Sequence, residues 1–91
     1  MVLYNMGMSQ IHLKQYQQAA QSLKRTVDLE PGWAQAQLNL AILYYQHLGR
    51  QKESIPHFKK VLELNPNVQN KQEIKKIIQK FHPQKRGVDL E

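Results

Sequence analysis

A segment of about 35 residues occurs twice in this chain of 91 residues, and no other feature constrains the fold as strongly. Residues 22–32 read SLKRTVDLEPG and residues 57–67 read HFKKVLELNPN. Leu23 corresponds to Phe58 at an offset of 35 residues. The basic, acidic and proline positions that flank Leu23 correspond to positions of the second copy at the same offset. Upstream the offset is 34, as between Asn5 and Asn39. We therefore expect one extra residue in the second copy, in the turn around residues 47–50.

Each copy predicts two helices, because apolar and small residues recur at the spacing i, i+3, i+4, i+7. The first-helix sets are Leu3, Met6, Gly7 and Gln10, and Gln37, Leu40, Ala41 and Tyr44. The second-helix sets are Ala19, Ala20, Leu23 and Val27, and Ser54, Ile55, Phe58 and Leu62. We expect small residues such as Gly7 to let the two helices of a hairpin approach closely. Pro31 and Pro66 end the second helices, since the residue before a proline is disfavoured in the α region.

Other residues mark the remaining boundaries. Gly49 predicts a helix C-cap, and Pro56 predicts a helix start near residues 52–54. Ile74, Ile77, Ile78 and Phe81 form the apolar face of a third helix, which Pro83 ends. We divide the domain, residues 1–83, into repeat one (1–32), repeat two (33–67) and a capping helix (68–82). Residues 84–91 have no periodicity and predict a disordered tail, with a cloning remnant at its end as an open alternative.

Catalysis and membrane insertion find no support in the sequence. The chain has no cysteine, its four histidines have no metal-ligand spacing, and its glycines form no phosphate loop. No serine lies in a nucleophile elbow. We therefore expect no enzyme activity, no metal site and no cofactor. No apolar stretch approaches the ~20 residues of a membrane span, and the N-terminus does not resemble a signal peptide, which favours a cytoplasmic location.

Over residues 3–81 the pattern resembles the tetratricopeptide repeat family, whose repeats read W-x2-L-G-x2-Y, A-x3-F and P. The matching positions are Met6-Gly7, Tyr16, Ala19, Leu23 and Pro31, and Leu40-Ala41, Tyr44, Ser54, Phe58 and Pro66; the departures are Leu3, Gln10, Gln37 and Val61. The resemblance implies an all-α solenoid of about five helices, built from antiparallel hairpins in a right-handed superhelix. It also implies a concave groove, lined by each first helix, that binds an extended peptide segment of another protein.

Family positions carried onto this chain predict a set of groove residues: Tyr4, Asn5, Met8, Gln35, Leu38, Asn39, Ile42, Tyr45 and Lys76. By the same argument Ile11 and His12 lie near them. Asn5 and Asn39 are equivalent, and their amides are suited to gripping a peptide backbone. Members that bind acidic chaperone tails use a clamp of which only Asn39 and Lys76 have counterparts here. Chaperone-tail binding is therefore not expected, although an acidic partner segment stays open.

Several alternatives remain open at this stage. The apolar groove set also fits a surface covered by a second copy or by a longer repeat array, because short arrays leave apolar ends exposed. We interpret Trp33 as packing between repeats. The charge of +6 is uneven: residues 1–45 have three basic and two acidic side chains, and residues 46–91 have ten and five. Lys71, Lys75, Lys76 and Lys80 fit a solvated helix face or an anion-binding stripe, and a nucleic-acid-binding module is a weaker hypothesis.

Overall fold

The computed structural model describes residues 2–81, and within this range the chain is helical without a β-strand. In chain order the elements are α1 (Val2–His12), α2 (Tyr16–Leu29), α3 (Ala34–Ile42), the π-helical turn η1 (Leu43–His47), α4 (Gln51–Leu64) and α5 (Lys71–Lys80). The predicted all-α fold is confirmed. The tail predicted at 84–91 and the stop predicted at Pro83 lie outside the described residues.

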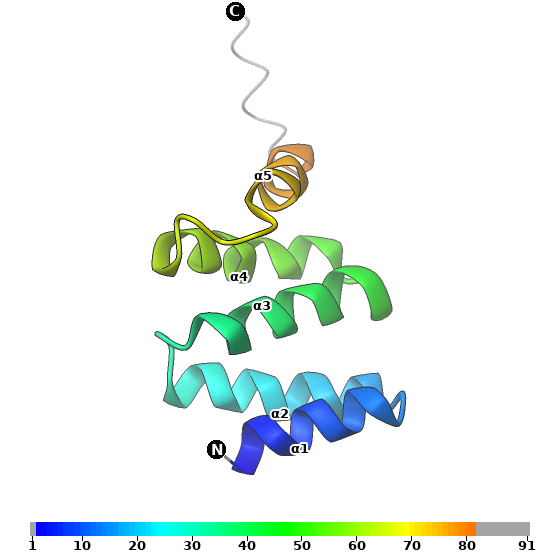
Figure 1. The fold of residues 1–91 in the computed structure, drawn as a ribbon. Helices are drawn as coiled ribbons and strands as arrows, with labels where there is room; N and C mark the ends of the chain where they lie inside the picture. The colour runs from blue at the N-terminus through cyan, green and yellow to red at the C-terminus, as the bar shows by residue number, and fades with distance from the viewer. Residues whose placement is uncertain (1, 82–91) are drawn as a thin grey trace, which may run out of the picture.

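The helices form two antiparallel hairpins that stack on one another, with a single helix at the end of the stack (Figure 1). The first hairpin is α1 with α2, and the second is α3 and η1 with α4. Helix α2 packs against α3, so the two repeats are joined through the second helix of one and the first helix of the next. Helix α5 lies on α4 and covers the far end, which is the cap expected from the sequence.

Two clusters of buried side chains hold the stack together. The first lies within and between the repeats and includes Leu23, Leu40 and Leu43, and the second joins repeat two to α5 through Phe58, Val61 and Ile74. Most residues of both clusters belong to the apolar faces that the helical spacing predicted, but Leu43 and Val61, for example, do not. Met6, which the spacing placed on the apolar face of α1, is instead 45% exposed. The second helices end at Leu29 and Leu64, two residues before Pro31 and Pro66, which confirms the predicted boundaries.

Gly7 marks the closest approach of the first hairpin. A Cβ atom placed on Gly7 would lie 3.0 Å from both Cγ and Cδ2 of Leu23, and 3.4 Å from Cβ of Ser22. Leu23 is completely buried in the first core cluster, so any shift of its side chain would disturb the neighbours packed around it. The prediction that a small residue lets these helices approach closely is confirmed.

The two hairpin turns differ, and the difference locates the extra residue of repeat two. In repeat one the N–H of Lys14 donates to the carbonyl of Ile11 and the N–H of Gln15 to that of Gln10, with Lys14 at φ 62°. These bonds form a Schellman turn. In repeat two Gly49 takes the left-handed position at φ 65°, but the N–H of Arg50 reaches back one residue further, to the carbonyl of Tyr44.

The extra residue is therefore absorbed in η1, where the N–H of Leu48 bonds the carbonyl of Leu43 over five residues. The expectation that it lies in the turn at 47–50 is corrected: the insertion is mostly inside the helix before that turn. A π-helical turn accommodates one residue without ending the helix, so the apolar pattern shows no break.

Two helix starts also differ from expectation. Helix α4 begins at Gln51, one residue before the predicted range 52–54, and Pro56 is its sixth residue. Pro56 is exposed and removes one hydrogen bond to the preceding turn without breaking the helix. Helix α5 begins at Lys71, three residues after the predicted start at residue 68. Residues 68–70 belong to the connection before it, in which Val68 packs against the second core cluster. Among the described residues no helix is both long enough and apolar enough to cross a bilayer.

Candidate functional site

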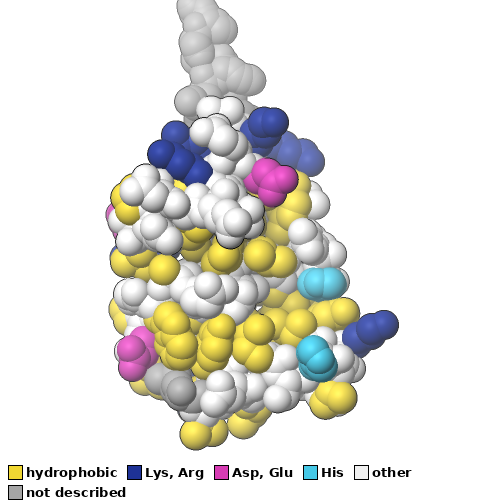
Figure 2. All heavy atoms as spheres, in the orientation of Figure 1, with side chains coloured by type: hydrophobic (Ala, Val, Ile, Leu, Met, Phe, Trp, Pro, Cys, Tyr) yellow, Lys and Arg dark blue, Asp and Glu magenta, His cyan; other side chains and the backbone are white. Residues whose placement is uncertain are grey.

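Two adjoining hollows lie on the face formed by α1, α3, η1 and α5, which we call the groove. The first measures about 150 Å³ and is lined by Met8, Ile11, Asn39, Ile42, Leu43 and His47. The second measures about 90 Å³ and is lined by Leu38, Ile42, Tyr45, Gln46, Phe58, Asn70, Glu73, Ile74 and Ile77. Ile42 belongs to both and separates them. Figure 2 shows hydrophobic side chains gathered across the middle of the molecule in this view.

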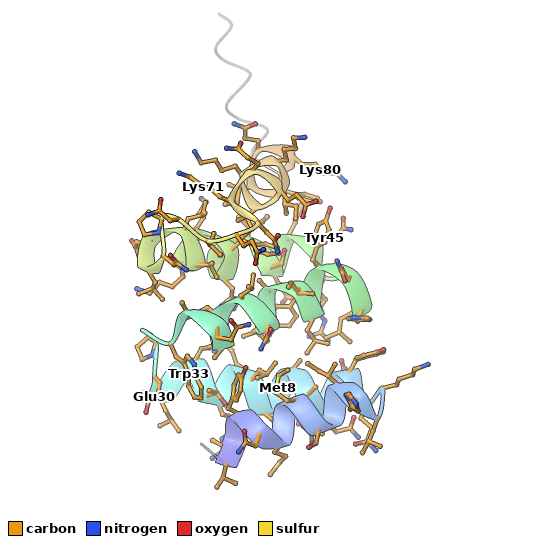
Figure 3. The ribbon with its side chains drawn as sticks, viewed as in Figure 1. Met8, Glu30, Trp33, Tyr45, Lys71 and Lys80 are labelled. Carbon is orange, nitrogen blue, oxygen red and sulfur yellow. The ribbon has the colours of Figure 1, made fainter. Side chains whose placement is uncertain are left out.

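Aromatic packing fixes the N-terminal end of the groove. The ring centroids of Tyr4 and Trp33 lie 4.4 Å apart, so a residue of α1 packs on the residue that caps the start of α3. Figure 3 shows Trp33 at this end and Met8 further along α1. The interpretation of Trp33 as a residue that packs between the repeats is confirmed.

Most of the hydrogen-bonding capacity of the Asn39 side chain is already used within the protein. Its amide nitrogen donates to the hydroxyl of Tyr4 at 2.9 Å and lies 3.4 Å from the sulfur of Met8. Its amide oxygen accepts a bond from Gln35 at 3.3 Å. An asparagine amide offers two donor hydrogens and two acceptor lone pairs, so one acceptor position remains for a ligand. Asn39 thus orients Tyr4 and Met8, the side chains around it.

Asn5, the counterpart of Asn39 in repeat one, is exposed on α1. Within residues 2–81 its side chain makes no hydrogen bond, so its amide is free to contact a partner. A joint role for the two asparagines in gripping a peptide backbone stays a prediction.

The C-terminal half of the groove differs from the sequence expectation. Tyr45 packs edge-on against Phe58, with centroids 6.2 Å apart, and Glu73 lines the hollow beside Ile77. Lys76 does not line it and is exposed. Ile74 is buried. Lys76 follows it by two residues, and this spacing places Lys76 about 200° around the helix axis from Ile74. The longer connection before α5 therefore presents an acidic side chain here, where a basic one was expected.

His47 is a groove residue that the sequence did not single out. It lines the first hollow, and its ring stacks on Tyr16 of repeat one at 4.3 Å with an angle of 16° between the planes. The π-helical turn places His47 there. His12, on α1, lines a separate shallow hollow with Met8, Ser9 and Leu13, where Leu13 is 67% exposed.

A polar link joins the repeats away from the groove. The side-chain amide of Gln37 donates to the carbonyl of Pro31 at 3.0 Å, and its oxygen lies 2.9 Å from Nδ1 of His57. The bond to Pro31 leaves the Gln37 oxygen as the acceptor, so His57 carries its proton on Nδ1. Burial lowers the pKa of His57, and the positive charge of Lys24 lowers it further, against a smaller opposite effect of Asp28.

Comparison with known protein families agrees with this architecture. Two family models, both described as tetratricopeptide repeat, match residues 1–32 and residues 34–68. The two matches coincide with the two hairpins and together span well over half of the chain, which therefore belongs to the tetratricopeptide repeat family. Among curated proteins, none matches the chain closely enough to count as a relative.

Tetratricopeptide repeats are generally protein–protein interaction modules, and their fold is not a catalytic one. Within residues 2–81 no three His, Asp or Glu side chains come together in a group that could hold a metal ion. The groove offers one mainly apolar hollow and one hollow of mixed lining, which are features suited to recognition.

Proposed function

We propose that this chain binds an extended peptide segment of a partner protein in the groove, and that it has no enzyme activity of its own. The observation that carries the proposal is the pair of hollows that meet at Ile42, the first mainly apolar and the second lined by apolar side chains together with Gln46, Asn70 and Glu73. A peptide that crosses both hollows would place one apolar side chain on each side of Ile42. Burying such a side chain is worth about 1.5–3 kcal/mol, so two anchors supply about 3–6 kcal/mol of the roughly 8 kcal/mol that a micromolar affinity requires.

The N-terminal half of the groove is already organised for binding. Asn39 holds the hydroxyl of Tyr4, and Tyr4 packs on Trp33, so these side chains lose little conformational freedom when a ligand arrives. Met8, which borders the first hollow, has an unbranched side chain that adapts to ligands of different shape. The fixed position of Tyr4 and the adaptable side chain of Met8 together support recognition of a peptide through its apolar residues.

The charges of the groove favour a neutral or basic peptide over an acidic one at its C-terminal end. Glu73 lines the second hollow, whereas Lys76 is exposed and is not among its lining residues. A carboxylate placed beside Glu73 would be repelled, and a lysine or arginine of the peptide would be attracted. The partner expected for the groove is thus a segment with two apolar residues followed by a neutral or basic one.

The proposal is tested by selecting binders from a random twelve-residue peptide library and measuring their affinities by calorimetry. Ile42→Ser removes the side chain shared by both hollows and should weaken binding about tenfold or more, because it removes most of an apolar contact. Leu29→Ser is the matched control, since Leu29 is 64% exposed at the end of α2 and lies outside the groove. Equal affinities of the Ile42 variant and the native protein would refute the proposal.

A second candidate function, self-association, rests on α1. Val2, Met6 and Leu13 of this helix are 77%, 45% and 67% exposed, although all three are apolar. Helix α1 lies at the end of the stack (Figure 1), where a further helix would cover its exposed apolar side chains in a longer array or a dimer. Light scattering over a dilution series tests this function: a dimer that dissociates on dilution supports it, and a monomer at millimolar concentration refutes it.

A further inference from the structure

A further hollow, larger than either hollow of the groove, lies between α2 and the junction of η1 with α4. It measures about 430 Å³ and is lined by Gln17, Ala20, Gln21, Lys24, Arg25, Tyr44 and Arg50. The α2 residues follow helical spacing and form one stripe, while Tyr44 and Arg50 come from repeat two. None of these seven residues lines the groove hollows, so this hollow is a separate surface.

Three cationic side chains and no acidic one line this hollow. Lys24 pairs with Asp28 at 2.9 Å, and Arg50 lies 3.6 Å from Glu53. Both carboxylates belong to exposed side chains outside the hollow. Arg25 has no ion pair with any residue that the structure describes. The hollow therefore carries a net positive charge, and the guanidinium of Arg25 is available to an incoming anion.

Tyr44 forms part of the wall of the hollow and is 9% exposed. Its hydroxyl has no hydrogen-bond partner within residues 2–81. In this range every side-chain polar atom that is fully enclosed does have a partner, so the Tyr44 hydroxyl is not fully enclosed. The hydroxyl therefore reaches the open space of the hollow. Burial raises the pKa of Tyr44, with a further contribution from Glu53, so at neutral pH the group is a hydrogen-bond donor.

We propose that this hollow is a second binding site, which takes a carboxylate side chain from an acidic segment of a partner protein. The hydroxyl of Tyr44 donates to one carboxylate oxygen, and the guanidinium of Arg25 provides a charged donor fork of the kind that fits a carboxylate. Ala20 and the ring of Tyr44 supply an apolar wall for the aliphatic stem of a glutamate. Arg25 and Tyr44 come from different repeats, so the site exists only when the repeats are stacked.

The charge balance favours a carboxylate over a phosphate group. Lys24, Arg25 and Arg50 contribute three positive charges, and the adjacent Asp28 and Glu53 take away two. The remaining single positive charge balances one carboxylate, but it does not balance the nearly two negative charges of a phosphoryl group. Acidic recognition thus lies on a surface other than the groove, whose wall includes the acidic residue Glu73.

The test uses fluorescence anisotropy of a labelled decapeptide that contains six glutamates. At low ionic strength the native protein should bind it, and the same peptide with glutamine in place of glutamate should not bind. Tyr44→Phe keeps the buried ring and removes only the hydroxyl, and Arg25→Gln changes an exposed side chain. Each should weaken binding about tenfold to a hundredfold, the range for a hydrogen bond to a charged group.

Lys75→Gln is the matched control, because it removes the same charge from an exposed position on α5. Its affinity should stay within about twofold of the native value. Helical circular dichroism of each variant shows that the fold is retained. Absence of binding by the native protein, or equal losses in Arg25→Gln and Lys75→Gln, would overturn the proposal. Binding of a phosphoserine peptide without binding of the glutamate peptide would overturn the choice of carboxylate.

Discussion

Enlarging Gly7 should separate the two helices of the first hairpin. A Cβ atom at this position meets two carbon atoms of Leu23 at 3.0 Å, which is tighter than an ordinary van der Waals contact. Overpacking of a tight core costs about 1–3 kcal/mol, and alanine regains about 1 kcal/mol through its higher helix propensity. We therefore expect Gly7→Ala to lower the free energy of unfolding by about 1 kcal/mol, and Gly7→Val by about 3 kcal/mol.

The assay is equilibrium unfolding in urea, followed by circular dichroism of the helices. Gly32→Ala provides the control, because no atom lies within 4 Å of a Cβ placed there and its backbone does not require glycine. That substitution should leave the free energy of unfolding unchanged or raise it by about 0.5 kcal/mol, through a lower entropy of the unfolded chain. A Gly7→Val protein as stable as the native one would show that α1 and α2 are not closely packed, and would refute the reasoning.

Three further substitutions test other parts of the structure. Trp33→Ala should lower the free energy of unfolding by about 2–3 kcal/mol, measured in urea, because it removes packing between the repeats, while Trp33→Phe should lose less than half of that. Folding lowers the pKa of His57, so the unfolded chain takes up a proton more readily than the native protein. The native protein should therefore lose stability as the pH falls below about 6.5. Thermal unfolding from pH 7.5 to 5 should show this dependence, and His57→Gln should reduce it. Pro56→Ala restores an N–H inside α4, so it should raise the free energy of unfolding by about 1 kcal/mol and raise the melting temperature with it. A lower melting temperature would mean that Pro56 packs favourably.

The arrangement of the helices follows from the sequence because apolar spacing and proline positions act locally. Leu23, Phe58 and Ile74 occupy positions in a helical pattern, and each is buried in the structure. Gly7 was predictable for the same reason: a residue without a side chain in the middle of an apolar face has few roles other than close packing. The family pattern then supplied the order in which the helices stack.

The π-helical turn was predictable only in part. The change of offset from 34 to 35 shows that one residue is inserted, but it does not show how the backbone absorbs it. Leu43–His47 contains ordinary helix-forming residues, and bonds over four and five residues compete there with little difference in the side-chain pattern. Because this turn also places His47 against Tyr16, one wall of the first hollow could not be predicted.

Sequence reasoning named several residues that line the hollows of the proposed groove, but it gave an incomplete account of the chemistry there. Met8, Leu38, Ile42 and Tyr45 line its hollows. Lys76 does not, because the rotation of α5 depends on a connection whose geometry the sequence leaves undetermined. The bond of Asn39 to Tyr4 joins residues 35 positions apart, and no local pattern indicates such a contact. Side-chain pairing across repeats requires the packed structure.

The most direct test of the central hypothesis, that the groove binds a peptide, is a nuclear magnetic resonance titration of the isotope-labelled protein with a peptide from the library selection. The hypothesis predicts that the largest shifts fall on Met8, Ile11, Ile42 and Ile77, while Gln17 and Gln21 on α2 stay nearly unchanged. Saturating shifts confined to α2 and α4, with none in the groove residues, would contradict it.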